Sequence, residues 1–511
     1  MLAHALSGSV LGVDAYLVRV EVDLARGLPS ISVVGLPQSA VREGRERVTA
    51  ALLNGGFELP PRRITINLAP ADVRKEGSAF DLPIAVGLLA ASGVLGVEAV
   101  AATCLTGELG LGGELRPVRG VLSLSLRCWQ ERVGSLIVPR GNGAEAAVVE
   151  GVEVREAATL GDVVAHLRGE RTLPRVAPGA GAGPGPCGAQ PDLSEVRGQE
   201  AARRGLEVAA AGAHNLLLVG PPGAGKSMLA RRLPGILPEL TIREALEATR
   251  VHSVAGQLGP GVALLRRRPF RAPHHSVSDA GLIGGGSIPR PGEASLAHHG
   301  VLFLDELPEF RRNVLEALRQ PLEDGTVHLG RARTAVTFPA RLMLVGAMNP
   351  CPCGYHGDSE GRCICHSGQV LRYLARVSGP LLDRIDLHVE MPALASGELQ
   401  RRRGGESSAA VAARVRVARE IQTRRFERRE DVHANAQMTP RDIRTHCAVD
   451  AAGAALLRKA MDRLGLSARG YHRVLKIART IADLAGEDRV RATHVAEAVQ
   501  YRALDRRPRP N

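Results

Sequence analysis

The segment Gly220-Pro-Pro-Gly-Ala-Gly-Lys-Ser227 constrains the fold of this 511-residue chain more than any other feature. It follows the apolar run Leu216–Val219 and precedes residues 228–233, whose pattern predicts a helix. A glycine-rich turn between a buried strand and a helix lets backbone N–H groups surround phosphates, and the positive end of the helix attracts the same anions. The spacing predicts that Lys226 contacts the β- and γ-phosphates of a nucleotide and that the Ser227 hydroxyl binds Mg²⁺. The predicted nucleotide-binding residues are Gly220, Pro221, Pro222, Gly223, Ala224, Gly225, Lys226 and Ser227.

Lysine is rare in this chain, which makes Lys226 more informative. Only four of the 66 basic residues are lysines. A basic residue that stood in this turn by chance would therefore nearly always be arginine. Because a phosphate cradle needs a compact ammonium rather than a planar guanidinium, the lysine favours phosphate binding over a glycine-rich turn that merely starts a helix.

Two further predicted strands end in polar residues of the kind that nucleotide hydrolysis requires. The apolar run Val301–Leu304 is followed by Asp305 and Glu306. We expect Asp305 to hold the Mg²⁺ ion and Glu306 to orient and activate the attacking water. Residues 342–347 form the other strand, and the amide of Asn349 beyond it is placed to reach the γ-phosphate or the water. Together with the glycine-rich turn, these residues predict a P-loop NTPase that uses ATP and Mg²⁺.

The sequence predicts a multidomain α/β protein with three domains. Periodicity predicts an N-terminal α+β domain over residues 1–170, a parallel-sheet domain over 193–395 and a helical domain over 396–511. A linker is expected at 171–192, because residues 176–190 are rich in Gly, Ala and Pro and carry no charge. The expected N-terminal strands are 15–22, Ser30–Val34 and 63–68, and the expected helices there are 38–54 and 80–89. The expected C-terminal helices are 408–427, 440–447, Ala451–Leu464, 468–485 and 492–503.

The net charge of +13 is concentrated at the C-terminal end. Residues 401–511 hold 25 basic and 13 acidic side chains, whereas residues 1–400 hold 41 and 40. This excess suggests a polyanionic partner, most plausibly nucleic acid, with a solvated basic surface as the alternative. Aromatic residues make up 3% of the chain, which disfavours recognition by base stacking. The sequence has no apolar run of about 18 residues and no signal peptide pattern, so we expect a cytoplasmic protein without a membrane segment.

Four of the eight cysteines form two Cys-x-Cys pairs separated by nine residues. The members of the cluster are Cys351, Cys353, Cys363 and Cys365. Four thiolates at such spacing suit a tetrahedral structural Zn²⁺ site, which would brace the strand that ends near Asn349. Reduced, unligated thiols and a redox switch are the alternatives, and His356 or His366 could replace a ligand. Isolated buried or incidental thiols are expected at Cys104, Cys128, Cys187 and Cys447.

Six segments give the chain a resemblance to a known family over nearly its full length. They are KEGSAFDLP (75–83), FRAPHHS (270–276), VLFLDEL (301–307), NPCPCG (349–354), LLDRIDL (381–387) and SARGYHR (467–473). With these motifs the chain resembles the YifB/ComM family of magnesium-chelatase-like AAA+ ATPases. The resemblance implies an N-terminal Lon-protease-like domain, a central AAA+ P-loop domain and a C-terminal helical lid. It also implies a hexameric ring that promotes branch migration of DNA, notably in natural transformation.

The same resemblance implies roles for four polar residues outside the glycine-rich turn. Asn349 corresponds to the sensor-1 residue, and Arg384 corresponds to an arginine finger that reaches the γ-phosphate bound by a neighbouring subunit. Arg469 corresponds to the sensor-2 arginine of the lid, with Arg473 one turn further as the competing assignment. For Arg384 the alternative is a surface ion pair with Asp383 or Asp386.

A Lon-like domain raises the possibility of a Ser/Lys protease dyad, which this sequence disfavours. The position of the protease serine corresponds to Ala79, and Ser78 is displaced from it by one residue. The position of the general-base lysine corresponds to Leu122, and Lys75 is the sole lysine of this domain. Without a desolvated amine to activate it, Ser78 is an ordinary hydroxyl, and a scaffold role is expected instead.

Basic loops offer candidate contacts to DNA phosphates. They are Arg266–Arg268 with Arg271, which precede the turn 284–286, and Arg331 with Arg333 in a predicted hairpin at 325–336. Such insertions line the pore in related AAA+ motors and would bind DNA without reading its sequence. The leading interpretation is an ATP-driven DNA translocase or branch-migration helicase. The alternatives are an ATPase that remodels protein or metal-insertion complexes, and a nucleotide-switched scaffold.

Overall fold

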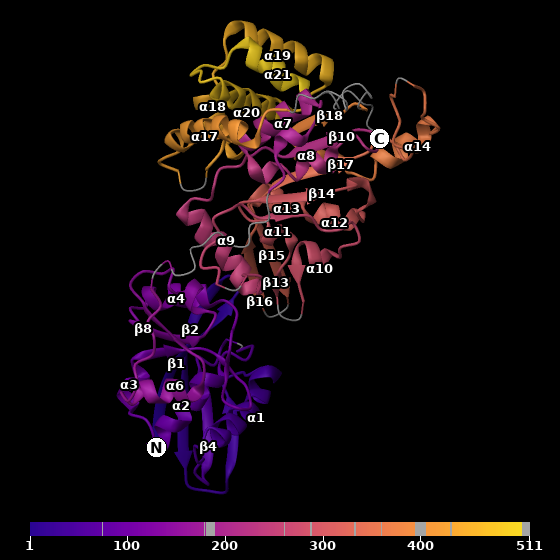
Figure 1. Cartoon of the computed structure of the whole chain (residues 1–511). Helices are drawn as coiled ribbons and strands as arrows, with labels where there is room; N and C mark the ends of the chain where they lie inside the picture. Colours follow the sequence, from indigo (N-terminus) through magenta and orange to yellow (C-terminus); the bar gives the residue numbers. More distant parts are fainter. Residues whose placement is uncertain are drawn as a thin grey trace. The chain divides into compact units, whose positions relative to one another are not determined.

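The computed structural model describes residues 1–73, 75–177, 179, 190–259, 261–286, 289–331, 334–358, 360–393, 405–429 and 432–502 (Figure 1). The chain forms two compact units. The N-terminal unit comprises Met1–Pro186, Ile242–Leu265 and Gly330–Thr337. The second unit comprises Cys187–Thr241, Arg266–Leu329 and Phe338–Asn511. The units therefore do not follow a simple division along the sequence, because two short internal segments belong with the N-terminal unit.

The N-terminal unit is built on a seven-stranded mixed sheet with the strand order β3-β4-β2-β1-β5-β8-β9. Its strands are β1 (Leu2–Leu11), β2 (Asp14–Ala25), β3 (Ser30–Val34), β4 (Arg63–Ala69), β5 (Thr103–Leu105), β8 (Ser135–Pro139) and β9 (Glu153–Ala157). β2 pairs antiparallel with both β1 and β4, and the other neighbours in the sheet are parallel. A small antiparallel hairpin is formed by β6 (Glu108–Leu109) and β7 (Leu115–Arg116).

Seven helices belong to the described part of the N-terminal unit. They are α1 (Ser39–Asn54), α2 (Asp81–Ala91), α3 (Val97–Ala101), α4 (Val121–Gln130), α5 (Gly143–Ala146), α6 (Leu160–Leu167) and α9 (Ile242–Ala255). Every residue of α2 is buried, because the helix is apolar on all sides and packs against β1 and β2. α9 follows the glycine-rich turn in sequence but packs against α4. There the Ser253 hydroxyl donates to Glu145 at 2.6 Å and Arg250 donates to the Val13 carbonyl at 2.9 Å.

The second unit contains a parallel five-stranded sheet with the order β11-β14-β17-β10-β18. Its strands are β10 (Leu216–Val219), β11 (Phe270–Arg271), β14 (Val301–Leu304), β17 (Met343–Met348) and β18 (Leu387–Glu390). Leu216 and Leu218 point into one apolar core, whereas Leu217 and Val219 point into another on the opposite face. Strand β10, which leads into the glycine-rich turn, is fully buried, and this explains its uninterrupted apolar sequence.

Short helices and hairpins surround the sheet of the second unit. The helices are α7 (Glu200–Gly212), α8 (Lys226–Ala230), α10 (Asp279–Leu282), α11 (Glu293–Leu296), α12 (Arg312–Ala317), α13 (Arg319–Asp324), α14 (Ser367–Leu374) and α15 (Gly379–Leu382). Single 3₁₀ turns lie at Leu193–Glu195, Leu233–Gly235, Leu307–Glu309 and Asn435–Gln437. One hairpin pairs β12 (Gly284–Gly285) with β13 (Arg290–Pro291), and the other pairs β15 (Thr326–Arg331) with β16 (Thr334–Pro339).

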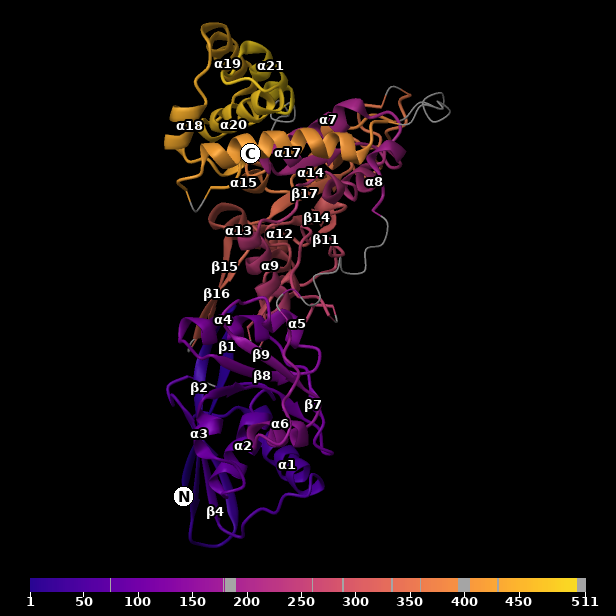
Figure 2. The same cartoon turned by 60° about the vertical axis from the view of Figure 1, so that its left-hand side comes forward.

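The C-terminal part of the second unit is helical, as predicted. Its helices are α17 (Ser408–Arg425), α18 (Pro440–His446), α19 (Ala451–Leu464), α20 (Ala468–Leu484) and α21 (Ala492–Gln500). Helices α17 and α20 pack against α7, and α21 packs against α19 and α20. The yellow helices α19, α20 and α21 lie together in Figure 2. One apolar core runs continuously from the α7 face of the sheet into these helices.

The expected strands and helices named above are present, with boundaries that shift by a few residues. The helix expected at 228–233 is shorter, because α8 ends at Ala230 and a 3₁₀ turn follows. Strand β1 was not predicted, since its buried positions Ala3, Ala5 and Ser7 are small and give little hydrophobic alternation. Among the described residues, no helix is both long enough and apolar enough to cross a membrane. The Lon-like identity of the N-terminal domain stays a prediction.

Candidate functional site

The glycine-rich turn lies between β10 and α8, at the carboxyl edge of the parallel sheet. Gly223 and Gly225 adopt φ values of +77° and +89°, and a Cβ atom at either residue would have no heavy atom within 4 Å. The turn therefore has an open inner side, which only glycine can line at these backbone angles without strain. This geometry fits the phosphates of a nucleotide, because the N–H groups of the turn lie at the start of a helix.

The Lys226 ammonium lies within this turn. It donates hydrogen bonds to the carbonyls of Gly220 at 2.7 Å and Pro221 at 2.9 Å, and to Asn349 Oδ1 at 2.9 Å. Burial lowers the pKa of Lys226, and the nearby carboxylates of Asp305 and Glu306 oppose that shift. The structure thus brings the predicted lysine and the predicted sensor-1 amide into direct contact, from strands β10 and β17, which pair side by side.

The two predicted Mg²⁺ ligands are also brought together. Ser227 Oγ donates to Asp305 Oδ2 at 2.5 Å. Ser227 is in the first turn of α8, and Asp305 directly follows β14. A hydroxyl and a carboxylate that converge at a phosphate cradle are suitable oxygen ligands for Mg²⁺.

Glu306 is held in an unusual backbone conformation beside Asp305. Its φ of +52° lies in the left-handed region, which non-glycine residues rarely adopt, and its backbone N–H donates to Asp305 Oδ1 at 3.0 Å. The Glu306 carboxylate lies 3.6 Å from His275 Nδ1, and the His275 ring packs edge-on against Phe310. Sequence reasoning included His275 in a family segment but assigned it no role, because nothing in the sequence indicates that residue 275 meets residue 306.

The predicted arginine finger lies at the opposite edge of the sheet. The Asn215 side chain, at the amino end of β10, accepts a hydrogen bond from the Leu344 N–H and donates one to the Arg384 carbonyl, both at 2.8 Å. Arg384 is thus beside residue 215, whereas the phosphate cradle begins at Gly220. Five residues of extended strand separate these positions by about 16 Å.

Arg384 and the predicted sensor-2 arginine share one acidic partner. Arg384 donates to the Glu323 carboxylate, and Arg469 lies 3.9 Å from the same carboxylate. The hydrogen bond from Arg384 lowers the pKa of Glu323. Arg384 therefore does not form the ion pair with Asp383 or Asp386 that was considered as its alternative. Glu323 was not singled out from the sequence.

Arg473, the competing sensor-2 assignment, is held in the interior. Its side chain is 13% exposed, and Nε lies 3.2 Å from Asp386 Oδ1. Asp386 also accepts from the Asn215 N–H and lies 3.3 Å from His214 Nδ1. Burial raises the pKa of Asp386, but the His214 hydrogen bond and the charges of His214 and Arg473 outweigh it and hold the pKa at about 2. Both sensor-2 candidates therefore lie at the amino edge of the sheet, away from the cradle.

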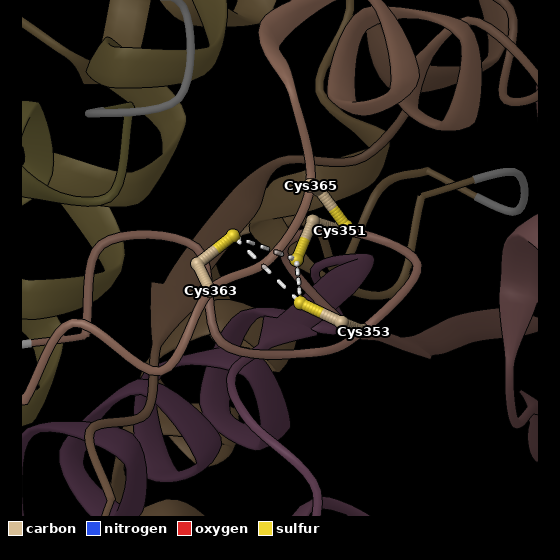
Figure 3. Close-up of side chains that lie close together, drawn as sticks. All are labelled: Cys351, Cys353, Cys363 and Cys365. Carbon is tan, nitrogen blue, oxygen red and sulfur yellow. Dashed lines mark hydrogen bonds between the residues drawn. The ribbon is translucent and has the colours of Figure 1, made fainter.

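The four clustered cysteines lie together, as Figure 3 shows. The four sulfur atoms all lie within 4.8 Å of one another. Cys351 Sγ is 3.3 Å from Cys353 Sγ and 3.8 Å from Cys363 Sγ. Hydrogen bonds from the backbone N–H groups of Tyr355 and Ile364 hold the pKa of Cys353 at about 6, against the effect of burial. A metal ion could thus be ligated by four thiols. His366 instead caps α14 through its Nδ1, which accepts from the Gln369 N–H at 3.3 Å.

Three other cysteines that the structure describes do not join this cluster. Cys104, Cys128 and Cys447 are buried free thiols. Cys187 lies outside the described residues.

The candidate DNA contacts are only partly solvent-facing. Arg271 forms a two-pronged ion pair with Glu293 at 2.6 and 2.8 Å, and Arg268 donates to the carbonyls of Pro238 and His299. Arg266 is exposed. The candidate residue Arg333 and the side chain of Arg331 lie outside what the structure describes.

In the N-terminal unit, the groups considered for a protease dyad have separate partners. The buried Lys75 ammonium donates to the carbonyls of Pro70 and Val73, whereas the Ser78 hydroxyl donates to Glu108. Leu122 is a buried residue of α4. Lys75 and Ser78 thus each bind a different partner in the structure.

Comparison with known proteins identifies relatives along the whole chain. Residues 192–399 match the family described as magnesium chelatase, subunit ChlI. Residues 20–142 match the family described as subunit ChlI of Mg-chelatase, and residues 405–502 match the ChlI C-terminal family.

Individual relatives agree with these matches. The chain is 47% identical over 508 residues to competence protein ComM of Haemophilus influenzae, which covers 99% of this chain and 98% of the relative. It is 47% identical over 504 residues to YifB of Escherichia coli K12, with 98% and 96% covered. A more distant relative is the magnesium-chelatase 38 kDa subunit of Rhodobacter capsulatus, 29% identical over 177 residues that cover 31% of this chain and 50% of that subunit.

Proposed function

The chain belongs to the YifB/ComM family of magnesium-chelatase-like AAA+ proteins, and from that premise we propose that it is a ring-forming ATPase that drives DNA translocation or branch migration. The family supports ATP and Mg²⁺ as its cofactors. The competence protein among its relatives supports a role in transformation and hence DNA as the substrate. The ring and the roles of individual residues in hydrolysis are argued from the positions of those residues.

The placement of two polar clusters at opposite edges of one sheet carries the proposal. Lys226, Ser227 and Asp305 meet at the carboxyl edge, whereas Arg384 and Arg469 meet at Glu323 on the amino edge. Because about 16 Å of strand separates the edges, the arginines of one copy are too far from its own phosphate cradle. These arginines can reach a bound nucleotide only when the amino edge of one copy faces the carboxyl edge of the next. A head-to-tail contact gives a ring when its rotation closes and a filament when it does not. We infer a closed ring and, from the family resemblance, a hexamer.

Each residue has one task in the proposed hydrolysis. The backbone of the turn and Lys226 bind the phosphates, and Ser227 and Asp305 hold the magnesium ion, which would supply charge neutralisation on the phosphate oxygens. Glu306 takes the proton of the attacking water, and Asn349 orients the water or the γ-phosphate. Arg384 stabilises the charge that develops on the transferred phosphoryl group of the neighbouring site, with Arg469 beside it.

DNA would bind through phosphate contacts. The basic excess of residues 401–511 and exposed arginines such as Arg266 support an interaction without sequence specificity. We also infer a structural Zn²⁺ in the cysteine cluster, a proteolytically inactive Lon-like domain and a cytoplasmic location.

ATP hydrolysis measured with no DNA, single-stranded DNA, duplex DNA and a four-way junction tests this function. We expect DNA to stimulate hydrolysis, with an apparent affinity that falls steeply with salt. An ATPase that ignores every DNA but responds to a protein partner would overturn the DNA assignment and favour a remodelling ATPase. The native mass with ATP present tests the ring.

A further inference from the structure

The cysteine cluster is packed directly against the phosphate-binding turn. Gly354, which follows Cys353, has a φ of +88°. A Cβ atom added at Gly354 would lie 2.4 Å from Pro222 Cδ and 2.7 Å from Pro222 Cγ. Pro222 is the third residue of the turn, so the loop that carries the cysteines is in van der Waals contact with the cradle.

A second connection runs through Asn349. Its amide oxygen accepts a hydrogen bond from Lys226, and Cys351 follows two residues later. Directly after Cys351 the backbone turns, and the Gly354 N–H donates to the Cys351 carbonyl at 3.0 Å. The segment 349–354 therefore touches the nucleotide site twice, once at Lys226 and once at Pro222.

Among the described residues 352–358 and 360–364 of the loop that carries the cysteines, no side chain belongs to an apolar core. Ile364, between the last two cysteines, is 88% exposed. In the polar stretch after Gly354, Arg362 forms a two-pronged ion pair with Asp358 and stacks over the Tyr355 ring at 4.6 Å. Ion pairs at a solvated surface contribute little to stability. A loop without its own apolar core needs another constraint, and four convergent sulfurs supply one when they bind a metal.

We propose that a tetrahedral thiolate-bound metal, Zn²⁺, held by the four cysteines sets the affinity of the phosphate-binding turn for nucleotide through the Gly354–Pro222 contact. With the metal bound, the loop supports Pro222 and holds Asn349 toward Lys226. When the metal leaves, the loop loses its shape and the cradle loses both supports. Nucleotide binding is thereby coupled to the metal content of the protein. This inference rests on the proposed ATP site and adds a regulator to it.

The first experiment uses the full-length protein purified under reducing conditions. Metal content is measured by mass spectrometry, and the affinity for a fluorescent ATP analogue is measured before and after the metal is displaced with a mercurial reagent and a chelator. We expect one Zn²⁺ per chain, binding that is about tenfold weaker after its removal, and recovery when the mercurial is removed by thiol and Zn²⁺ is restored.

Two glycine variants separate the contact from the metal. Gly354→Ala places a methyl group against Pro222, whereas Gly357→Ala adds the same methyl at a φ of +81° where no heavy atom lies within 4 Å. We expect both variants to keep their Zn²⁺ and Gly354→Ala alone to bind ATP about tenfold more weakly. If Gly354→Ala loses its metal, the displacement experiment on the wild-type chain still decides the question.

The outcomes distinguish this inference from the proposed function. A protein that binds and hydrolyses ATP but holds no metal, or that binds ATP equally well with and without Zn²⁺, overturns the inference and leaves the ATPase intact. Absorption near 400 nm with bound iron would overturn zinc in favour of an iron–sulfur cluster. If the zinc-loaded wild-type chain binds no ATP at all, the proposed function itself fails.

Discussion

Arg384 and Arg469 meet at a single carboxylate, that of Glu323, although they belong to the sheet domain and to the helical C-terminal part of the chain. At this carboxylate two guanidinium groups meet a single negative charge. A site with surplus positive charge suits the triphosphate of an adjacent subunit. The two arginines proposed as finger and sensor therefore share one carboxylate within the chain.

The first prediction concerns Arg384. Arg384→Ala should lower the rate of ATP hydrolysis at least about 100-fold, because the guanidinium acts on the transition state. The affinity for ATP should change little. Arg376→Ala is the control, since Arg376 also pairs with a glutamate, Glu309, although it is more exposed than Arg384, and it has no assigned role. Steady-state kinetics and nucleotide binding check this, and an unchanged turnover number would rule out the finger assignment.

Lys226 provides the second prediction. Lys226→Ala should weaken ATP binding about 100-fold, because it removes a buried charge that faces the phosphates, and Lys226→Arg should not rescue it. The ammonium is enclosed by carbonyls at 2.7 and 2.9 Å, which a planar guanidinium does not fit. Lys459→Ala, an exposed lysine of α19, is the control. Calorimetric titration measures the affinity for ATP. Normal ATP binding by Lys226→Ala would contradict the phosphate-binding role of Lys226.

Glu306 should be needed for hydrolysis but not for binding. Glu306→Gln keeps the size of the side chain but cannot accept the proton of the water, so turnover should fall at least about 100-fold while ATP remains bound. Glu309→Gln, three residues further along the same turn, should keep normal turnover. Equal rates for Glu306→Gln and the wild type would show that another group activates the water.

Much of the nucleotide site could be predicted from the sequence because its parts are local. A buried strand, a glycine-rich turn and a helix follow one another at residues 216–230, and their order alone places Lys226 and Ser227. Predicting that Asp305 lies beside them also required the rule that the carboxyl ends of parallel strands meet at one edge of the sheet. The cysteine cluster was visible for the same reason, since its pairs are close in sequence.

Contacts between distant segments could not be predicted in this way. The partner of Arg384 is Glu323 on α13, and no pattern in the sequence connects these residues. The same holds for His275 beside Glu306 and for Gly354 against Pro222. Each depends on the packing of loops, which hydrophobic periodicity does not encode. Strand β1 was not predicted, because its small buried residues give little hydrophobic alternation along the sequence.

Asp386 links stability to pH. Its pKa of about 2 in the folded protein is below the ordinary value of 3.8, so the group stabilises the fold fully above about pH 4. This contribution, about 2 kcal/mol, is lost as the pH falls from about 4 toward 2. Asp386→Asn should therefore lower the free energy of unfolding at pH 7 by at least that amount, and the difference from wild type should shrink near pH 3.

Urea unfolding at pH 7 and pH 3 checks the Asp386 prediction. Asp462→Asn, which changes an exposed carboxylate on α19, provides the comparison. A difference between wild type and Asp386→Asn that stays the same at both pH values would contradict the role of the Asp386 charge.

A mixing experiment tests most directly whether the ATP site is completed by a neighbouring copy. Arg384→Ala chains keep an intact cradle and Glu306, whereas Glu306→Gln chains keep an intact finger. In rings assembled from equal amounts of the two, about a quarter of the interfaces combine a normal cradle with a normal finger. We predict that the mixture hydrolyses ATP well above the sum of the two separate proteins. Activity equal to that sum, in rings shown to contain both chains, would contradict a shared site.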